Sequence, residues 1–273
     1  MINQDLNVSK IKQGSFNIEK IYLDCIDEHG NCFIVYRVKA EFFLIRFIYS
    51  GLVFCSAEGI TTQKSTLRKA EKPVHNKIIN FNHKFLNIGV SLDRVDDPII
   101  RSLFKDDKNN ELVWNCHHPK ALAEISYNGN CYKGSGYAET LFLPLKPWNL
   151  PIDELRWGRF LSDSCTLIWI NWEGKYPLNK LFFNGVEYND ATFEKEIIKF
   201  SDGTYQLKFS EIQLIRKGRL SELFSKMKFL KIFFNRSILN SVEIKYKARS
   251  SLCNNTLVLS NGWSLFEIVT WGK

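Results

Sequence analysis

Two neighbouring segments of the sequence carry side chains that could do acid chemistry on an apolar molecule. Gly134–Glu139 contains the phenol of Tyr137 and the carboxyl group of Glu139, and the next aromatic segment contains Trp157 and Arg159. A carboxyl group among aromatic rings is poorly solvated, so its charged form is disfavoured and its pKa rises. Such a group can donate a proton near neutral pH. The competing interpretation is a structural ion pair among strand aromatics.

The spacing of Tyr137 and Glu139 favours a shared environment for the two side chains. Residues two apart in a strand point to the same face of a sheet. The position of Arg159 then decides the chemistry. A direct ion pair would keep Glu139 ionised, whereas an offset Arg159 would bind a polar group of the substrate or lie at the rim of a pocket.

The segment 114–118 adds a cysteine and two histidines. Alternation along a strand predicts that Cys116 and His118 converge and that His117 points away. A zinc site would need further ligands, so we expect no metal. A hydrogen-bonded imidazole near Glu139 that positions water or relays a proton is one interpretation. A structural histidine pair is another, and a nucleophilic Cys116–histidine dyad stays open.

The elements that must position these residues are strands. Short stretches of β-branched and aromatic residues separated by Asp-Gly, Asn-Gly and Glu-Gly turns indicate antiparallel sheets without βαβ units. Up-and-down barrels close their edges, and small ones can hold one ligand. The strand candidates are Ile21–Ile26, Asn31–Val38, Glu41–Cys55, Lys77–Phe81, Phe85–Leu92, Ala121–Tyr127, Thr166–Trp172, Asn179–Phe183, Ile197–Phe200, Tyr205–Ile215, Ser241–Tyr246 and Trp263–Trp271.

The proline-rich segment from Pro147 to Glu154 interrupts the strand pattern. We place a domain boundary there, which gives an N-terminal β domain at 1–150 and a C-terminal one at 151–273. The sequence therefore predicts an all-β protein with two tandem antiparallel barrel-like domains and one or two short helices.

One segment, 216–236, has apolar residues at helical spacing and a basic side. A helix packed across a barrel mouth is the first interpretation. An interfacial helix that rests on a membrane and admits a lipid-like substrate is the second. A long twisted hairpin is the third.

Composition limits the class of protein and its compartment. The 273 residues include 37 basic and 29 acidic side chains, a formal charge of +8 that favours anionic surfaces such as membrane headgroups. No recognised nucleic-acid-binding motif is present, so we expect no nucleic-acid partner. The seven scattered cysteines and the missing signal-peptide pattern are typical of a cytosolic protein. We expect a cytoplasmic protein, with peripheral contact at the inner face of a membrane through 216–236.

Three segments together resemble a known family. Gly134–Glu139, Pro144-Leu145 and 156–159 (Arg-Trp-Gly-Arg) resemble the carotenoid 1,2-hydratase (hydroxyneurosporene synthase) family, related lipocalin-like proteins and, more remotely, tocopherol cyclase. Glu139 stands where that family usually has aspartate. The closing segment 262–269 also looks like the family's terminal strand, so the resemblance spans about residues 20 to 271.

The resemblance implies two lipocalin-like domains with a deep apolar pocket and cofactor-independent addition of water to an isoprenoid double bond. Glu139 would be the acid and Tyr137 its hydrogen-bond partner. Trp114 and Trp157 would be aromatic walls that stabilise a carbocation. His117 or His118 would correspond to the family's upstream histidine.

The function predicted first is a hydratase, cyclase or isomerase that acts on an apolar isoprenoid or polyene. Its predicted catalytic residues are Glu139, Tyr137, His118 and His117, and its predicted substrate-binding residues are Trp114, Trp157 and Arg159. The alternative is a non-catalytic carrier of an apolar ligand in the same barrel. A basic membrane-peripheral scaffold with filled barrels is a third interpretation, and it predicts no cavity.

Overall fold

Two curled antiparallel sheets form almost all of the structure. The computed structural model describes residues 16–42, 45–223, 235–255 and 257–272. The first sheet contains β1 (Phe16–Asp27), β2 (Cys32–Phe42), β3 (Ile45–Cys55), β4 (Thr61–Thr66), β5 (Ile78–His83), β6 (Ile88–Arg94), β7 (Ile99–Lys105), β8 (Glu111–Tyr127) and β9 (Asn130–Leu143). The second contains β10 (Glu154–Leu161), β11 (Thr166–Glu173), β12 (Leu178–Phe183), β13 (Val186–Tyr188), β14 (Thr192–Phe193), β15 (Ile197–Phe200), β16 (Tyr205–Arg219), β17 (Val242–Asn254) and β18 (Leu257–Thr270).

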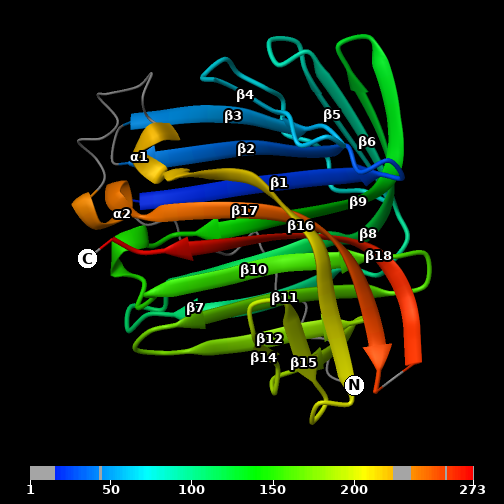
Figure 1. Cartoon of the computed structure of the whole chain (residues 1–273). Helices are drawn as coiled ribbons and strands as arrows, with labels where there is room; N and C mark the ends of the chain where they lie inside the picture. Colours follow the sequence, from blue (N-terminus) through cyan, green and yellow to red (C-terminus); the bar gives the residue numbers. More distant parts are fainter. Residues whose placement is uncertain (1–15, 43–44, 224–234, 256, 273) are drawn as a thin grey trace. The chain divides into compact units, whose positions relative to one another are not determined.

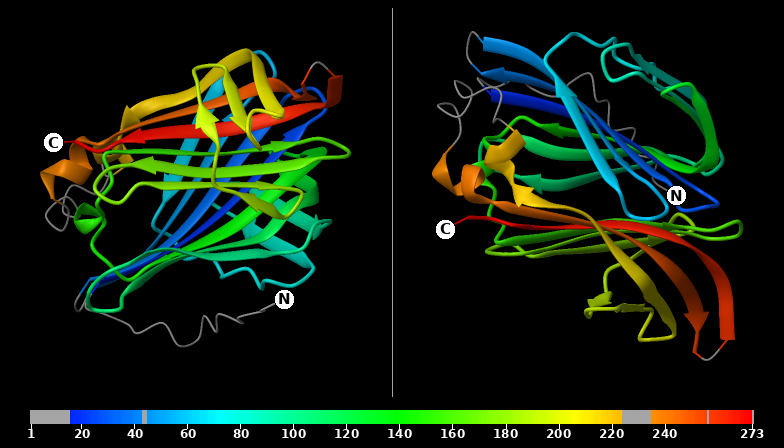
Figure 2. Two further views of the ribbon diagram at one scale, coloured as in Figure 1. Left: turned by 90° about the horizontal axis from the view of Figure 1, so that it is seen from below. Right: turned by 45° about the horizontal axis from the view of Figure 1, so that its top comes forward.

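Neighbouring strands follow a simple order in each sheet (Figure 1). The first runs β4-β3-β2-β1-β9-β8-β6-β5, with β7 beside β8, and the second runs β13-β12-β11-β10-β18-β17-β16-β15-β14. Figure 2 shows the curvature of each sheet from two further directions. The described helical elements are the 3-10 turn η2 (Pro147–Asn149) and the short helices α1 (Leu220–Leu223) and α2 (Arg236–Asn240). The predicted all-β class is confirmed.

The chain divides into two compact units. Unit 1 consists of 1–25, 33–53 and 63–150, and unit 2 of 26–32, 54–62 and 151–273. Unit 2 therefore includes the β1–β2 turn and the β3–β4 turn besides the whole second sheet.

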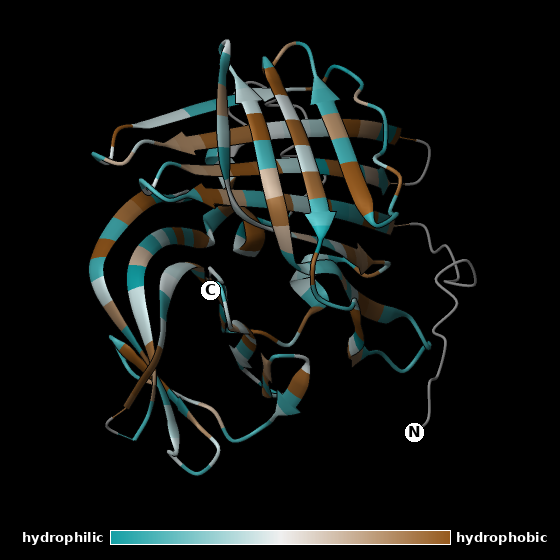
Figure 3. Cartoon of the chain, turned by 90° about the vertical axis from the view of Figure 1, so that its right-hand side faces the viewer, coloured by the Kyte–Doolittle hydropathy of each residue, from teal (hydrophilic) through white to brown (hydrophobic). Residues whose placement is uncertain are grey.

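Strands differ in how many of their faces are buried. The central strands β1, β10 and β11 contain runs of successive buried residues, whereas other strands have one buried and one exposed face. In β5 the residues Ile79, Phe81 and His83 are buried and their neighbours are exposed, and the C-terminal half of β8 alternates in the same way. Figure 3 shows the resulting stripes of apolar and polar residues along the strands. This period of two is the pattern that a half-buried strand requires.

The predicted helix at 216–236 is wrong at its start. Arg216–Arg219 ends β16, where these four residues pair with 242–245 of β17. Backbone pairing with a long neighbouring strand outweighs the local helical pattern there. Helix α1 occupies only 220–223, and 224–234 lie outside the described residues, so membrane contact by this segment stays a prediction. Within the described part of the chain, no helix has the length and hydropathy to cross a membrane.

Candidate functional site

The carboxyl group of Glu139 is the centre of a buried hydrogen-bonded cluster in unit 1. Glu139 lies on β9 opposite Cys116 of β8, in the long hairpin that turns at Asn128-Gly129. The Tyr137 hydroxyl donates to Glu139 Oε2 at 2.6 Å, and the Trp114 indole N–H donates to the same oxygen. The predicted placement of Tyr137 and Glu139 on one face is therefore seen in a direct contact.

Burial shifts the pKa values of this cluster. Trp114 is 1% exposed, Tyr137 0% and Glu139 7%. Loss of solvation raises the pKa of Glu139, although the hydrogen bonds from Tyr137 and Trp114 and the charge of Lys20 act against it. Because both donors bind Oε2, we assign the proton of the neutral acid to Oε1.

The surroundings of Tyr137 are aromatic and weakly polar. The Tyr22 ring meets the Tyr137 ring edge-on at 6.0 Å, and Cys116 hydrogen-bonds with Tyr137. Burial raises the pKa of the Cys116 thiol and of the Tyr137 phenol well above their usual values. A thiol that stays protonated is a poor nucleophile, which disfavours the Cys116–histidine dyad.

The predicted convergence of Cys116 and His118 is wrong. A β-bulge shifts the register, so His118 pairs with Ala138 instead of Tyr137 and faces away from Glu139. The His118 Nε2 atom lies 3.0 Å from the Lys77 carbonyl oxygen, and His117 Nε2 lies 2.7 Å from Thr140 Oγ1.

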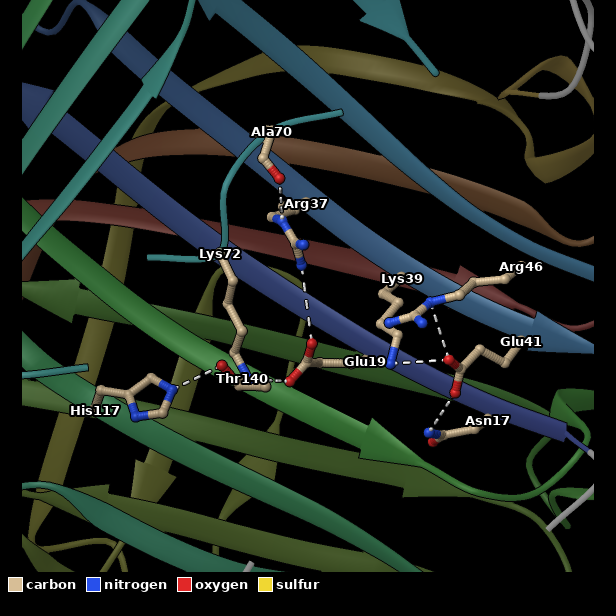
Figure 4. Close-up of polar contacts among 10 residues, drawn as sticks. All are labelled: Asn17, Glu19, Arg37, Lys39, Glu41, Arg46, Ala70, Lys72, His117 and Thr140. Atoms are coloured by element: carbon tan, nitrogen blue, oxygen red, sulfur yellow. Dashed lines mark hydrogen bonds and ion pairs between the residues drawn. The ribbon is translucent and has the colours of Figure 1, made fainter. Parts of the chain in front are cut away.

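A second polar cluster, missed by the sequence analysis, surrounds His117 (Figure 4). The His75 ring stacks on the His117 ring, with centroids 3.8 Å apart. The Glu19 carboxylate pairs with the Lys72 ammonium group at 2.5 Å and with the Arg37 guanidinium group at 3.8 Å, and Figure 4 shows Thr140 beside Lys72. Among the described residues, no group of three or more His, Cys, Asp or Glu side chains is arranged to hold a metal.

Burial keeps the stacked histidines neutral. Burial is the largest cause that brings the pKa of His75 to about 4 and that of His117 to about 2, with smaller contributions in the same direction from the charges of Lys72 and His118. Neutral imidazoles accept or donate one hydrogen bond at each nitrogen, which suits the contact between His117 and Thr140. His75 comes from the segment between β4 and β5, so strand alternation could not have located it.

We expect the protein to lose stability as the pH falls below about 6.5, because the unfolded chain then protonates His75 and His117 and the folded chain does not. Each histidine contributes up to about 1.4 kcal/mol per pH unit, down to its folded pKa. Urea unfolding measures the free energy of unfolding at pH 7 and pH 5. Between these two pH values, the His117→Gln variant should lose less of this free energy than the parent protein.

The matched control is His29→Gln, since the His29 side chain is 74% exposed. This variant removes an imidazole that lies outside the stacked pair, and its unfolding is measured at the same two pH values. An unchanged pH dependence in His117→Gln would show that His117 titrates normally in the folded protein.

The structure places Trp157 and Arg159 on β10 of unit 2, outside the unit that holds Glu139. Both are buried, and Arg159 Nη1 donates to the Trp263 carbonyl oxygen at 3.2 Å. Gly158 between them allows the Trp169 ring to cross β10, because a Cβ atom there would lie 2.3 Å from that ring. Their predicted substrate-binding roles stay predictions.

The paired curled sheets define a two-domain, lipocalin-like β protein, as predicted. Its structure is similar to CghA solved with Sch210972, with a TM-score of 0.58 and 10% identity over 94% of this chain and 89% of that one. It is also similar to kievitone hydratase from Nectria haematococca (TM-score 0.55, 11% identity, 96% and 92% covered). An AttH-like protein from Nitrosomonas europaea gives a TM-score of 0.58 at 8% identity, with 94% and 93% covered. At these identities the similarity shows the fold alone.

Sequence comparisons assign no family. No protein-family model matches the chain. Over 106 residues it is 27% identical to transcription factor bHLH10 of Arabidopsis thaliana, a match that covers 38% of this chain and only 21% of that protein. The local match is too short to show a family.

Proposed function

We propose that the protein is a hydratase- or cyclase-type enzyme that protonates an isolated C=C bond of an apolar isoprenoid or polyene. The observation that supports this proposal is the buried carboxyl group of Glu139, whose Oε2 accepts hydrogen bonds from Tyr137 and Trp114. A carboxyl group with a raised pKa in a poorly solvated site is suited to donate a proton to carbon.

In the proposed reaction, the π electrons of the alkene take the proton from Glu139 Oε1. A C–H bond forms, and a tertiary carbocation and the Glu139 carboxylate remain. The two donors on Oε2 stabilise the new carboxylate. The faces of buried rings, Trp114 first, stabilise the cation by cation–π attraction.

Two routes complete the cycle and regenerate the acid. In a hydratase, water adds to the cation and the oxonium proton returns to Glu139. In a cyclase, a second double bond of the substrate attacks the cation, and a C–H proton beside the new cation is lost to Glu139. Neither route consumes a cofactor.

The fold and the local motif support different parts of the proposal. A lipocalin-like fold shared with kievitone hydratase supports a hydratase- or cyclase-type reaction. The resemblance of Gly134–Glu139 to the carotenoid 1,2-hydratase motif supports an isoprenoid or polyene as the substrate.

Incubation with a panel of linear isoprenoids and polyenes in D₂O tests the proposal. A hydratase product gains a carbon-bound deuterium and a hydroxyl group, and a cyclase product gains one deuterium without added oxygen. Mass spectrometry distinguishes the two. Saturable binding without labelled product would instead support a non-catalytic carrier, and a panel with neither binding nor product would overturn both.

A further inference from the structure

Unit 2 contains a cavity that the proposed reaction does not use. Its volume is about 410 Å³, which falls in the range of small-molecule sites. All of its lining residues belong to unit 2, to strands β10, β11, β14, β15, β16, β17 and β18 or to the turn between β14 and β15. None of them belongs to the Glu139 cluster of unit 1.

One wall of this cavity is a continuous set of aromatic rings. The Phe266 ring stacks with Phe209 at 4.9 Å and with Tyr246 at 5.2 Å, and Trp169 lies 6.4 Å from it. These four residues come from four different strands. Gly158 leaves the space that the Trp169 ring occupies beside Phe266.

The ring wall is incompletely covered by the protein itself. Phe209, Tyr246 and Phe266 are only partly buried, although β17 and β18 lie well inside the sheet. Partly bare rings at the bottom of a cavity offer stacking surface to a flat ligand.

The charged residues around the cavity favour an anionic group on that ligand. Glu194 pairs with Lys199 at 2.6 Å, and Glu267 pairs with Lys245, so both acids are already neutralised. Arg156 pairs with Glu154 at 2.8 Å in the same way and donates to the Phe193 carbonyl oxygen. The exposed Lys195 is therefore the positive charge of the lining that these ion pairs do not neutralise.

We propose that this cavity is a second binding site, for one flat aromatic molecule that carries an anionic group. The ligand rings stack on Phe266 and its neighbours, and the anion faces Lys195. This site is separate from the chemistry of Glu139, and its occupancy does not depend on turnover.

Fluorescence titration with 8-anilinonaphthalene-1-sulfonate, an aromatic anion with a flat naphthalene ring, tests the site. We expect saturable binding of one molecule per chain. Ile212 lines the cavity and is 38% exposed, so Ile212→Trp should fill the space and weaken binding at least tenfold. Val186→Trp is the matched control, because Val186 is 57% exposed on β13 and lies outside the lining.

Reversing one charge distinguishes binding of the probe in this cavity from binding elsewhere on the basic surface. Lys195→Glu should weaken binding several-fold, and Lys208→Glu, an exposed change on β16 outside the lining, should not. Glu139→Gln should leave the affinity unchanged, which distinguishes this site from the proposed catalytic one. Equal effects of Ile212→Trp and Val186→Trp, or unchanged binding in both Ile212→Trp and Lys195→Glu, would overturn the proposal.

Discussion

Replacing Glu139 with glutamine is expected to lower the rate of product formation by about 10²- to 10⁴-fold, the usual contribution of a general acid. The amide has the shape of the neutral carboxylic acid, and its oxygen can still accept hydrogen bonds from Tyr137 and Trp114. It has no acidic proton to give to an alkene. Deuterium incorporation from D₂O into the substrate, followed over time, measures the loss.

The control for this change is Glu124→Gln on β8, in the same unit. The Glu124 side chain is 57% exposed and pairs only loosely with Lys133, at 3.4 Å. It should keep full activity, and both variants should unfold at the denaturant concentration of the parent to within a small margin. A Glu139→Gln protein with parental turnover would exclude Glu139 as the acid.

Replacing Lys247 with methionine is expected to destabilise the folded protein by about 2 kcal/mol, the usual cost of one unsatisfied buried group. Lys247 is 1% exposed, and its Nζ donates to the carbonyl oxygens of Gly30 at 2.5 Å and Ser56 at 2.7 Å. Methionine keeps the apolar stem but leaves the Gly30 carbonyl group without this donor, at about 1–3 kcal/mol for a buried unsatisfied group. The Ser56 carbonyl oxygen keeps the hydrogen bond from the Gly59 N–H, at 3.0 Å. The free energy of unfolding in urea measures the effect.

An exposed lysine on the neighbouring strand provides the comparison. Lys208→Met on β16 should change the free energy of unfolding by less than about 0.5 kcal/mol, as for most surface substitutions. If Lys247→Met were equally mild, the Gly30 carbonyl group would have to find water or another donor in the folded protein.

Much of the fold was predictable because strands carry a local signal. Alternating and β-branched stretches located most of the long strands, and the spacing of Tyr137 and Glu139 predicted their shared face. Strands β4, β7, β10, β13 and β14 were missed as strands. The connections on either side of β7 and of β10 contain no glycine, so the turn signal that marked other strands is missing there. Arg216–Arg219 was misassigned, since pairing with β17 is a long-range effect that local periodicity does not contain.

The candidate site was predictable only in part, for the same reason. The hydrogen bond from Trp114 to Glu139 depends on the register of β8 against β9, which joins residues 25 positions apart. The bulge after Cys116 reverses the alternation on which the placement of His118 rested. The stack of His75 on His117 joins the segment between β4 and β5 to strand β8, and the spacing of residues in the sequence could not predict this contact.

The ammonium group of Lys247 makes the second sheet dependent on the first quarter of the chain. Its two acceptors, at Gly30 and Ser56, are synthesised about 190 residues or more before it. A fragment that starts at Pro151 would bury this cation without either acceptor. We therefore expect that residues 151–273, expressed alone, do not fold stably. Supplying residues 1–150 in trans is the simplest way to restore the missing acceptors.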